Sequence, residues 1–176
     1  MDVYYKFSQR TIINFEELAD LRDFFSGEKI VFCSGTFDLL HLGQVYFLKK
    51  SKECGDLLVV SVGLDSVIKR NKDPKRPILN QDLRLRSIAE LRCVDFCFLD
   101  DEPEDTHPLA TLKTNLKNLR PNIYVVNHDA FDLDYRKKLL EGTSTKLEVL
   151  DTRVRFGGPN ESLVSTTEII KRIKAL

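Results

Sequence analysis

A histidine and a glutamine follow a glycine-containing turn, and their types and spacing suit the binding of a phosphate chain. The turn covers residues 34–44 and contains Gly35, His41 and Gln44. Because His41 and Gln44 are three positions apart, we expect them on one face of a helix that begins there. A helix N-terminus attracts anions through its free N–H groups and its dipole, and Gly35 allows the backbone to approach closely. The turn therefore predicts a phosphate-binding site.

The segments around this turn predict a strand before it and a helix after it. An apolar run at 29–33 leads into the turn, and residues 42–54 follow a helical pattern up to Gly55. A second apolar run at 57–62 does not alternate with polar residues, which is typical of a parallel strand covered on both faces. The turn then lies at the carboxyl end of a strand, where α/β sheets bind their ligands.

The rest of the chain continues this alternation. We expect a helix at 14–26, a basic loop at 69–76, helices near 81–92, 108–119 and 134–141, strands at 94–99, 123–126 and 147–150, an acidic loop at 100–105 and a last helix opened by Ser165. The predicted fold class is α/β, a Rossmann-like doubly wound sheet of about five parallel strands. We expect a single domain over 1–176, with an N-terminal helical extension at 1–28 and a core at 29–176.

Composition limits the classes of partner. Lys plus Arg and Asp plus Glu each number 27, so no overall field favours nucleic acid or a membrane surface, and an anion site must come from local placement. The apolar runs are strand-sized, so we expect neither a signal peptide nor a membrane span. The four cysteines form no CxxC pair, which favours buried reduced thiols. These features predict a cytoplasmic protein without nucleic-acid or membrane partners.

The turn resembles a known signature. Residues 35–43 match the GxFDxxHxGH pattern of the cytidylyltransferase-like superfamily, and the likeness covers roughly 28–174. Further matching features are the segment 60–65, the basic residues at 69–72, Arg76-Pro77, Arg84, Val94-Asp95 and Ser165-Thr166-Thr167. The pattern is most similar to the adenylyltransferase domain of ADP-heptose synthases and to glycerol-3-phosphate cytidylyltransferases. The resemblance implies a nucleotidyltransferase that moves a nucleoside monophosphate from ATP or CTP to a small phosphorylated acceptor and releases pyrophosphate.

The resemblance also implies roles for particular residues. The catalytic candidates are His41, Gln44, Lys69 and Lys72. The nucleotide-binding candidates that match the family pattern are Gly35, Thr36, Phe37, Asp38, Gly43, Arg84, Ser165 and Thr166. Asn127 and Asp129 are further nucleotide-binding candidates, although their segment departs from the pattern. Mg²⁺ is expected with the nucleoside triphosphate, but no protein metal ligands are assigned, since Mg²⁺ takes few protein ligands. Members of the family often form homodimers, and the sequence leaves the oligomeric state open.

Two departures from the family pattern keep alternatives open. The second histidine of the signature is Gln44 here, and an amide cannot carry a positive charge. A nucleotide-binding protein of the same fold with weak or no catalysis is therefore the alternative function. Residues 127–129 replace a segment that contains glycine in the related enzymes, so acceptor and base recognition do not carry over. A dinucleotide-binding oxidoreductase is disfavoured because no GxGxxG follows the first strand.

Several candidates also have simpler interpretations. Ser165 and Glu168 have the spacing of a capping box, and Asp38 could cap the helix at Leu40. The basic residues of 69–76 and the acidic run at 100–105 could be solvated loops. His107 is expected at the surface, whereas His128 is expected to face the cleft and to contact the acceptor.

Overall fold

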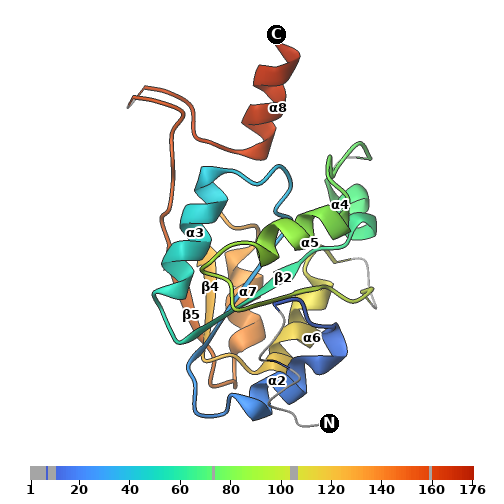
Figure 1. Cartoon of the computed structure of the whole chain (residues 1–176), viewed down its shortest axis with the longest axis vertical. Coiled ribbons are helices and arrows are strands. Elements are labelled where there is room, and N and C mark those ends of the chain that lie inside the picture. Colours follow the sequence, from blue (N-terminus) through green and yellow to red (C-terminus); the bar gives the residue numbers. More distant parts are fainter. Residues whose placement is uncertain (1–6, 8–10, 73, 104–106, 159) are drawn as a thin grey trace.

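The computed structural model describes residues 7, 11–72, 74–103, 107–158 and 160–176, and shows strands that alternate with helices (Figure 1). The elements are η1 (Phe15–Glu17), α2 (Leu18–Phe24), β1 (Ile30–Gly35), α3 (Leu42–Lys52), β2 (Leu57–Val62), α4 (Asp65–Asn71), α5 (Gln81–Ala89), β3 (Phe96–Leu99), α6 (Ala110–Leu119), β4 (Ile123–Asn127), α7 (Leu133–Leu140), β5 (Lys146–Leu150) and α8 (Thr166–Lys174).

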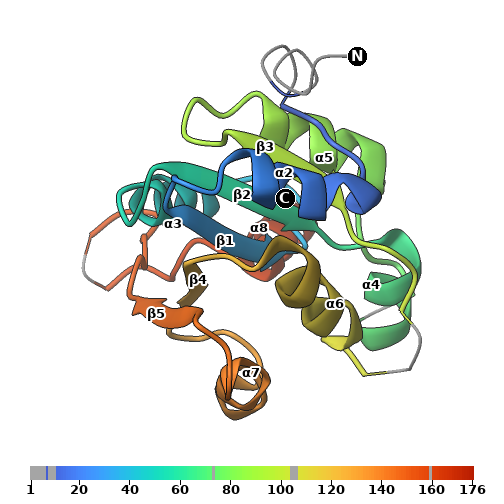
Figure 2. The same cartoon turned by 90° about the horizontal axis from the view of Figure 1, so that it is seen from below.

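The five strands form one parallel sheet in the order β3-β2-β1-β4-β5, as predicted (Figure 2). The chain builds β1, β2 and β3 outward in one direction, then returns to add β4 on the other side of β1. The order therefore reverses between β1 and β4. Such a reversal leaves a crevice at the carboxyl ends of the two strands, here next to Gly35 and Asn127, where ligands bind in this class of fold.

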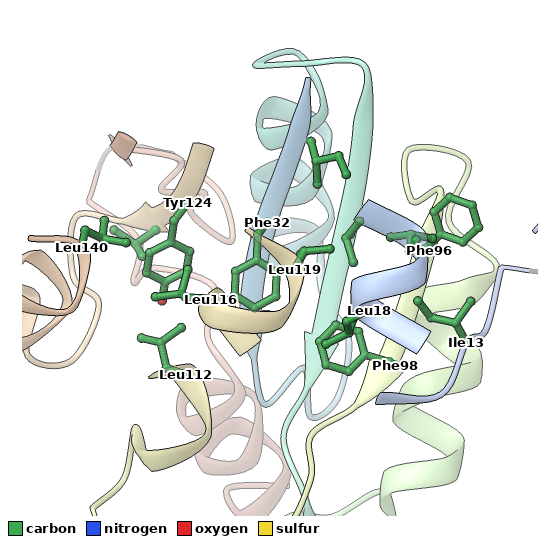
Figure 3. Packing of buried hydrophobic residues seen from close by; sticks show 14 of the residues in the cluster. Ile13, Leu18, Phe32, Phe96, Phe98, Leu112, Leu116, Leu119, Tyr124 and Leu140 are labelled. Carbon is green, nitrogen blue, oxygen red and sulfur yellow. The ribbon is translucent and has the colours of Figure 1, made fainter. Parts of the chain in front are cut away.

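Each face of the sheet has its own core. On one face, α3 and α5 cover β1, β2 and β3. On the other face, Phe32, Phe98 and Tyr124 of the strands pack with residues of α2 and α6, including Leu18 and Leu116 (Figure 3). The near-continuous burial of β1 and β2 follows from this two-sided cover.

The N-terminal segment belongs to the second of these cores. Phe7, Ile13, Leu18 and Leu21 are all buried in it. Backbone hydrogen bonds join residues 11–13 to Cys97 in β3, with the Ile13 N–H donating to the Cys97 carbonyl over 3.0 Å. The segment 11–24 therefore packs as part of the sheet's cover.

Several predicted boundaries were wrong, each for a local reason. The helix expected at 14–26 begins as a 3₁₀ turn and ends at Phe24. The strand expected from Val94 begins at Phe96, because the Val94 N–H closes a turn onto the Leu91 carbonyl. The basic segment is only partly a loop, since Lys69 lies in the last turn of α4.

Two further features of the fold bear on the predicted classes. No helix within the described ranges combines the length and the apolar character needed to cross a bilayer. Cys33 and Cys97 are buried, and desolvation raises the pKa of each thiol to about 12. Both thiols are therefore protonated and unreactive at neutral pH.

Candidate functional site

The turn after β1 has an unusual backbone that its surroundings hold in place. Phe37 and Leu39 have φ values of 50° and 48°, in the left-handed region that residues other than glycine seldom adopt. Between them, the Asp38 carboxylate is buried, with 1% exposure, and accepts hydrogen bonds from the backbone N–H groups of Ile78 and Leu79. The turn is therefore fixed from the side of the 76–79 loop.

Asp38 also forms an ion pair with Arg76, whose Nε lies 2.9 Å from its carboxylate. Desolvation alone would raise the pKa of Asp38, but the N–H donors of Leu79 and Ile78 and the Arg76 guanidinium outweigh it and lower the pKa. Asp38 does not cap the helix at Leu40, as one interpretation proposed, since α3 begins at Leu42. Its carboxylate instead anchors the neighbouring loop.

Arg84 supports the turn through a hydrogen bond to its backbone. It is fully buried, and its guanidinium donates to the carbonyls of Thr36, Gly63 and Leu79 and to the Asp65 carboxylate. All of these partners belong to the protein, and Arg84 lines neither of the two hollows described below. The structure therefore places this nucleotide-binding candidate in a positioning role beneath the turn.

Gly35 and Phe37 form a second support. The Phe37 ring is 5% exposed and packs into the core covered by α3 and α5. A Cβ added at Gly35 would lie 2.9 Å from this ring, so glycine is required for the close approach. The close approach to a phosphate that was expected at Gly35 stays a prediction; the contact that the structure shows there is with the Phe37 ring.

His41 stands at the N-terminus of α3, as its N-cap residue. Its ring lies against Gly43, where an added Cβ would come within 3.2 Å of two ring atoms. Desolvation lowers the pKa of His41, so the imidazole is neutral in the free protein at neutral pH. Its Nδ1 is buried and has no hydrogen-bond partner among the residues that the structure describes. A buried polar atom of this kind is available for a ligand.

Gln44 lies in the same first turn of α3. Its Oε1 accepts a hydrogen bond from the His41 backbone N–H at 3.3 Å. The side chain therefore helps to cap the helix, and its carbonyl is turned toward the N-cap. Both His41 and Gln44 line the same hollow, which confirms that they share one face.

A second helix N-terminus comes to the same place from the far end of the chain. Ser165 caps α8 by accepting a hydrogen bond from the Glu168 N–H, so the capping interpretation is correct for its hydroxyl. The Glu168 carboxylate instead accepts from the Ser162 hydroxyl. The Thr166 hydroxyl donates to the Asp38 carbonyl at 2.8 Å and so ties α8 to the turn. In Figure 1, α8 stands above α3, at one end of the molecule.

These elements enclose a hollow of about 1160 Å³, here called the outer hollow. Six cationic side chains and one acid, Asp129, line it. The cationic residues are Lys72, Lys75, Arg76, Arg153, Lys171 and Lys174. Although the whole chain has no net charge, this hollow gathers cationic side chains around two helix N-termini. Three of them form ion pairs with acids outside the lining: Arg76 with Asp38, Arg153 with Asp151 and Lys171 with Glu168. Such a place suits a polyanion.

The two candidate lysines are placed differently. Lys69 is exposed on α4 and lines neither hollow. Lys72 lines both, and its ammonium donates to the Thr36 hydroxyl at 3.0 Å. Lys72 is exposed as a residue, but desolvation of the ammonium against the turn and the nearby charge of Arg76 lower its pKa. Only Lys72 is positioned to contact a ligand.

A second hollow, of about 460 Å³, lies beside the first and is here called the inner hollow. Its lining includes the ends of β1 and β4, and residues of α4, α6 and α7. Lys72, Phe47 and Asn127 line both hollows and so mark their junction. The junction lies where the strand order reverses, as the fold class predicts.

Asp100 is the acid of the inner hollow. Its carboxylate accepts hydrogen bonds from the Ser61 hydroxyl and from the Asn115 amide, the latter at 2.8 Å. Desolvation raises its pKa, even though these donors oppose the shift. The acidic run was predicted to be a solvated loop, which is wrong for Asp100 because it turns inward from the end of β3. Residues 104 and 105 of that run lie outside the described residues.

Residues 127–129, at the end of β4 and directly after it, are placed differently with respect to the two hollows. Asn127 accepts hydrogen bonds from the Thr152 N–H and hydroxyl, and Asp129 lines the outer hollow. His128 was expected to face the cleft, but it lines neither hollow; its Nδ1 lies 3.7 Å from the Asp151 carboxylate. His107 is half-buried, with its ring 4.2 Å from the ring of Tyr135.

Sequence reasoning missed Asp100 and Arg136. Arg136 of α7 is 7% exposed and lines the inner hollow. Asp100 follows a predicted strand directly, and residues at strand ends face the crevice, so this signal was available. Arg136 lies in a segment with basic neighbours at 137 and 138, which hid the inward direction of its side chain.

Comparisons with known proteins identify a family for this chain. The model of a family described as cytidylyltransferase-like matches residues 32–172. The bifunctional protein HldE of Syntrophotalea carbinolica is 38% identical over 148 residues, which cover 84% of this chain and 27% of that protein. The HldE of Campylobacter fetus subsp. fetus is 37% identical over 166 residues, with 94% and 32% covered. The chain thus spans less than a third of the length of these relatives.

Two solved structures have a similar fold. A lipopolysaccharide core biosynthesis protein from Thermoplasma volcanium GSS1 is 31% identical with a TM-score of 0.61, covering 72% of this chain and 98% of that one. The pantoate-beta-alanine ligase of Francisella tularensis, solved with beta-gamma ATP and beta-alanine, is 19% identical with a TM-score of 0.62, covering 96% and 79%. At 19% identity this second likeness shows the fold alone.

Proposed function

The chain belongs to the cytidylyltransferase-like family, and from this premise we propose that it transfers a nucleoside monophosphate from ATP or CTP to a small phosphorylated acceptor, such as a sugar or polyol phosphate. Pyrophosphate is the other product. The family and the HldE relatives support a nucleotidyltransferase in general terms. The nucleotide, the acceptor and the roles of individual residues belong to the proposal.

The observation that carries this proposal is the convergence of two helix N-termini on one cationic hollow. The start of α3, with His41, and the start of α8, with Ser165 and Thr166, both line the outer hollow. Free N–H groups, helix dipoles and six cationic side chains suit a triphosphate. The hydrogen bond from Thr166 to the Asp38 carbonyl links the two helix starts, so both would contact the same phosphate chain.

We assign the triphosphate to the outer hollow and the acceptor to the inner hollow. The two ligands then meet at the junction, where Lys72, Phe47 and Asn127 line both spaces. Lys72 is held against Thr36 in the turn, so its ammonium lies where the α-phosphate and the acceptor phosphate would come together. Binding on either side of the junction would hold the two ligands next to each other in a defined orientation.

In the proposed reaction, an oxygen of the acceptor phosphate attacks the α-phosphorus. The bond from that phosphorus to the bridging oxygen breaks, and the oxygen leaves with the bonding electrons as part of pyrophosphate. Protein groups need only align the two ligands and stabilise charge on the phosphate oxygens. Lys72 would donate to the α-phosphate, and His41 would donate to the phosphate chain after taking up a proton that the anionic ligand favours.

Mg²⁺ is expected with the triphosphate and would neutralise part of its charge. The described residues hold no group of three or more His, Cys, Asp or Glu side chains that could form a metal site. The ion would therefore be held chiefly by phosphate oxygens and water.

A second candidate, nucleotide binding with little catalysis, is favoured by one observation. The Gln44 carbonyl contacts the N-cap, and an amide supplies no charge to the phosphates. One experiment separates the candidates. Thermal melting with ATP, CTP, GTP and UTP in the presence of Mg²⁺ identifies the nucleotide, since a ligand at 100 times its Kd adds about 2.7 kcal/mol. Pyrophosphate release with a panel of phosphorylated acceptors then indicates a transferase; binding without release indicates the second candidate.

A further inference from the structure

A buried guanidinium faces the inner hollow. Arg136 is 7% exposed, and its Nε donates to the Phe131 carbonyl at 2.9 Å. Its Nη1 donates to the Tyr124 hydroxyl, and the guanidinium lies 5.8 Å from the centroid of that ring. Arg136 lines the inner hollow but not the outer one. Its charge is therefore directed at the space that we assign to the acceptor.

No carboxylate of the described residues forms an ion pair with Arg136. Its hydrogen-bond acceptors are a carbonyl and a phenol, and burial raises the pKa of Tyr124, so the phenol stays neutral. Asp100 is the only acid among the described residues that line this hollow, and it accepts from Ser61 and Asn115. The positive charge of Arg136 therefore has no fixed counterion there.

Such an arrangement is costly unless a ligand completes it. A guanidinium cannot lose its proton at neutral pH, and a buried charge without an opposite charge destabilises the fold. The aromatic ring of Tyr124 compensates only in part. Two donors engage protein groups, and an arginine has five N–H bonds in a planar fork, which leaves an edge that matches a carboxylate or phosphate.

The reacting phosphate of the acceptor does not need Arg136. In the proposed reaction that phosphate lies at the junction, near Lys72 and Thr36. Arg136 is on α7 and lines no part of the outer hollow, whereas Lys72 lies at the end of α4, so the two cations reach the inner hollow from different elements. A second, separate charged site in one small hollow indicates a ligand with two anionic groups.

We infer that Arg136 binds a second anionic group of the acceptor, so that the preferred acceptor is a phosphorylated sugar or polyol that also carries a carboxylate or a further phosphate. This inference rests on the proposed function, because it takes the inner hollow as the acceptor site. It makes Arg136 a specificity-determining residue, one that distinguishes acceptors by the charge at the end remote from the reaction.

The test compares probes that differ at one end. Calorimetry with the full chain measures the binding of 6-phosphogluconate, of sorbitol 6-phosphate, which has a hydroxymethyl group in place of the carboxylate, and of fructose 1,6-bisphosphate. We expect at least one doubly anionic probe to bind roughly 10- to 100-fold more tightly than sorbitol 6-phosphate, as a hydrogen bond to a charged group implies. The better of the two identifies the second anion as carboxylate or phosphate.

Arg136→Gln should abolish this preference and leave sorbitol 6-phosphate binding unchanged. Lys137→Gln is the matched control, because it removes the same charge from an exposed position of the same helix. Arg136→Lys keeps the charge and should keep part of the preference, which covers the case in which the glutamine variant does not fold. A ratio near one in the unchanged protein, or an equal ratio in both Gln variants, would overturn the inference.

The binding and turnover measurements distinguish a failure of the proposed function from a failure of the inference about Arg136. If no nucleotide and acceptor pair releases pyrophosphate while the Arg136-dependent preference is present, the proposed function is wrong and the anion site stands. If transfer proceeds equally well to singly and doubly anionic acceptors, and Arg136→Gln leaves the KM for each unchanged, the proposed function stands and the inference is wrong.

Discussion

The outer and inner hollows share a junction but differ in size and in the side chains that line them. The outer hollow takes its donors from two helix starts and six cations, and α8, which closes it, has no buried residues. The inner hollow is smaller, its walls are helices that pack on the sheet, and among its described lining residues only Lys72 and Arg136 carry positive charge. We therefore propose that the same carboxyl edge of one sheet supports both a polyanion site and a more selective site.

Under the proposed assignment of ligands, the fold would divide affinity from specificity. A dense set of cations binds any triphosphate strongly and discriminates little among its other features. A mostly apolar space with a few directed polar groups binds through shape and through charge at fixed points. Variants in the outer hollow should therefore change nucleotide binding and rate, and variants in the inner hollow should change acceptor choice.

The largest expected effect is that of His41→Asn in the outer hollow. Asparagine can still cap α3, but it removes the imidazole from the phosphate site, so we expect turnover to fall about 10²- to 10³-fold with little change in thermal stability. Steady-state pyrophosphate release measures the effect. The control is His107→Asn, the same substitution at a residue that lines neither hollow. Near-normal turnover by a folded His41 variant would remove His41 from the site.

Asp38→Asn and Asp100→Asn should differ in their effect on the free energy of unfolding and in the pH dependence of that effect. The folded-state pKa of Asp38 is lowered, so its contribution is present above the unfolded value and is lost as the pH falls. The pKa of Asp100 is raised, so its contribution is present at low pH and is lost as the pH rises through the folded value. At pH 7 we expect Asp38→Asn to lower the free energy of unfolding by about 2 kcal/mol or more.

Asp100→Asn should be neutral or stabilising at pH 7, because the amide can still accept from Ser61 and Asn115 without burying a charge. Urea denaturation at pH 4.5 and pH 7 measures the free energy of unfolding of both variants. As the pH rises from 4.5 to 7, the loss of this free energy that is due to Asp100 in the parent protein should be absent from the Asp100 variant. Equal destabilisation of the two variants at pH 7 would mean that the two carboxyls play the same structural part.

Thr166→Val should weaken nucleotide binding about 3- to 10-fold. The change keeps the shape of the side chain and removes one neutral hydrogen bond, the link from α8 to the Asp38 carbonyl. Thr114→Val, the same substitution at an exposed threonine of α6 that lines neither hollow, is the control, and calorimetry with the nucleotide is the measurement. If the two variants bind equally well, the start of α8 acts only as a capped helix.

Gln44→His should raise turnover by a few-fold. A protonated imidazole would add a charged donor where Gln44 offers a neutral amide, and such bonds are about twice as strong. The gain should be largest near or below pH 6.5, where an unperturbed imidazole is protonated. Gln44→Glu, which keeps the capping acceptor but adds a negative charge, should lower turnover. A Gln44→His variant slower than the parent from pH 5.5 to 8.5 would show that the contact between Gln44 and the N-cap matters more than charge.

The sequence predicted most of the fold because local patterns determine it. Apolar runs without alternation marked β1 and β2, and Ser165 correctly marked the start of α8. The boundaries that were wrong, such as the start of β3, depend on single backbone hydrogen bonds in turns. Such bonds leave no periodic signal in the sequence.

The site was predicted less evenly. His41, Gln44 and Ser165 line the predicted hollow because their position at helix starts fixes their direction. Asp38 and Arg84 were grouped with them, but hydrogen bonds such as those from Leu79 to Asp38 and from Arg84 to Thr36, across 40 or more residues, direct both into the protein. Arg136 was missed for a different reason: its partners Phe131 and Tyr124 are near in sequence, but its basic neighbours made an exposed position the simpler interpretation.

The central claim is that the two hollows hold a triphosphate and a phosphorylated acceptor, and that an oxygen of the acceptor phosphate becomes bonded to the α-phosphorus. Phosphorus NMR of a reaction with the nucleotide and acceptor found by screening tests it directly. We expect a new pair of mutually coupled diphosphate resonances, one from the nucleotide α-phosphorus and one from the acceptor, with an equal amount of pyrophosphate. Nucleotide consumption that yields orthophosphate and a nucleoside diphosphate, with the acceptor resonance unchanged, would contradict it.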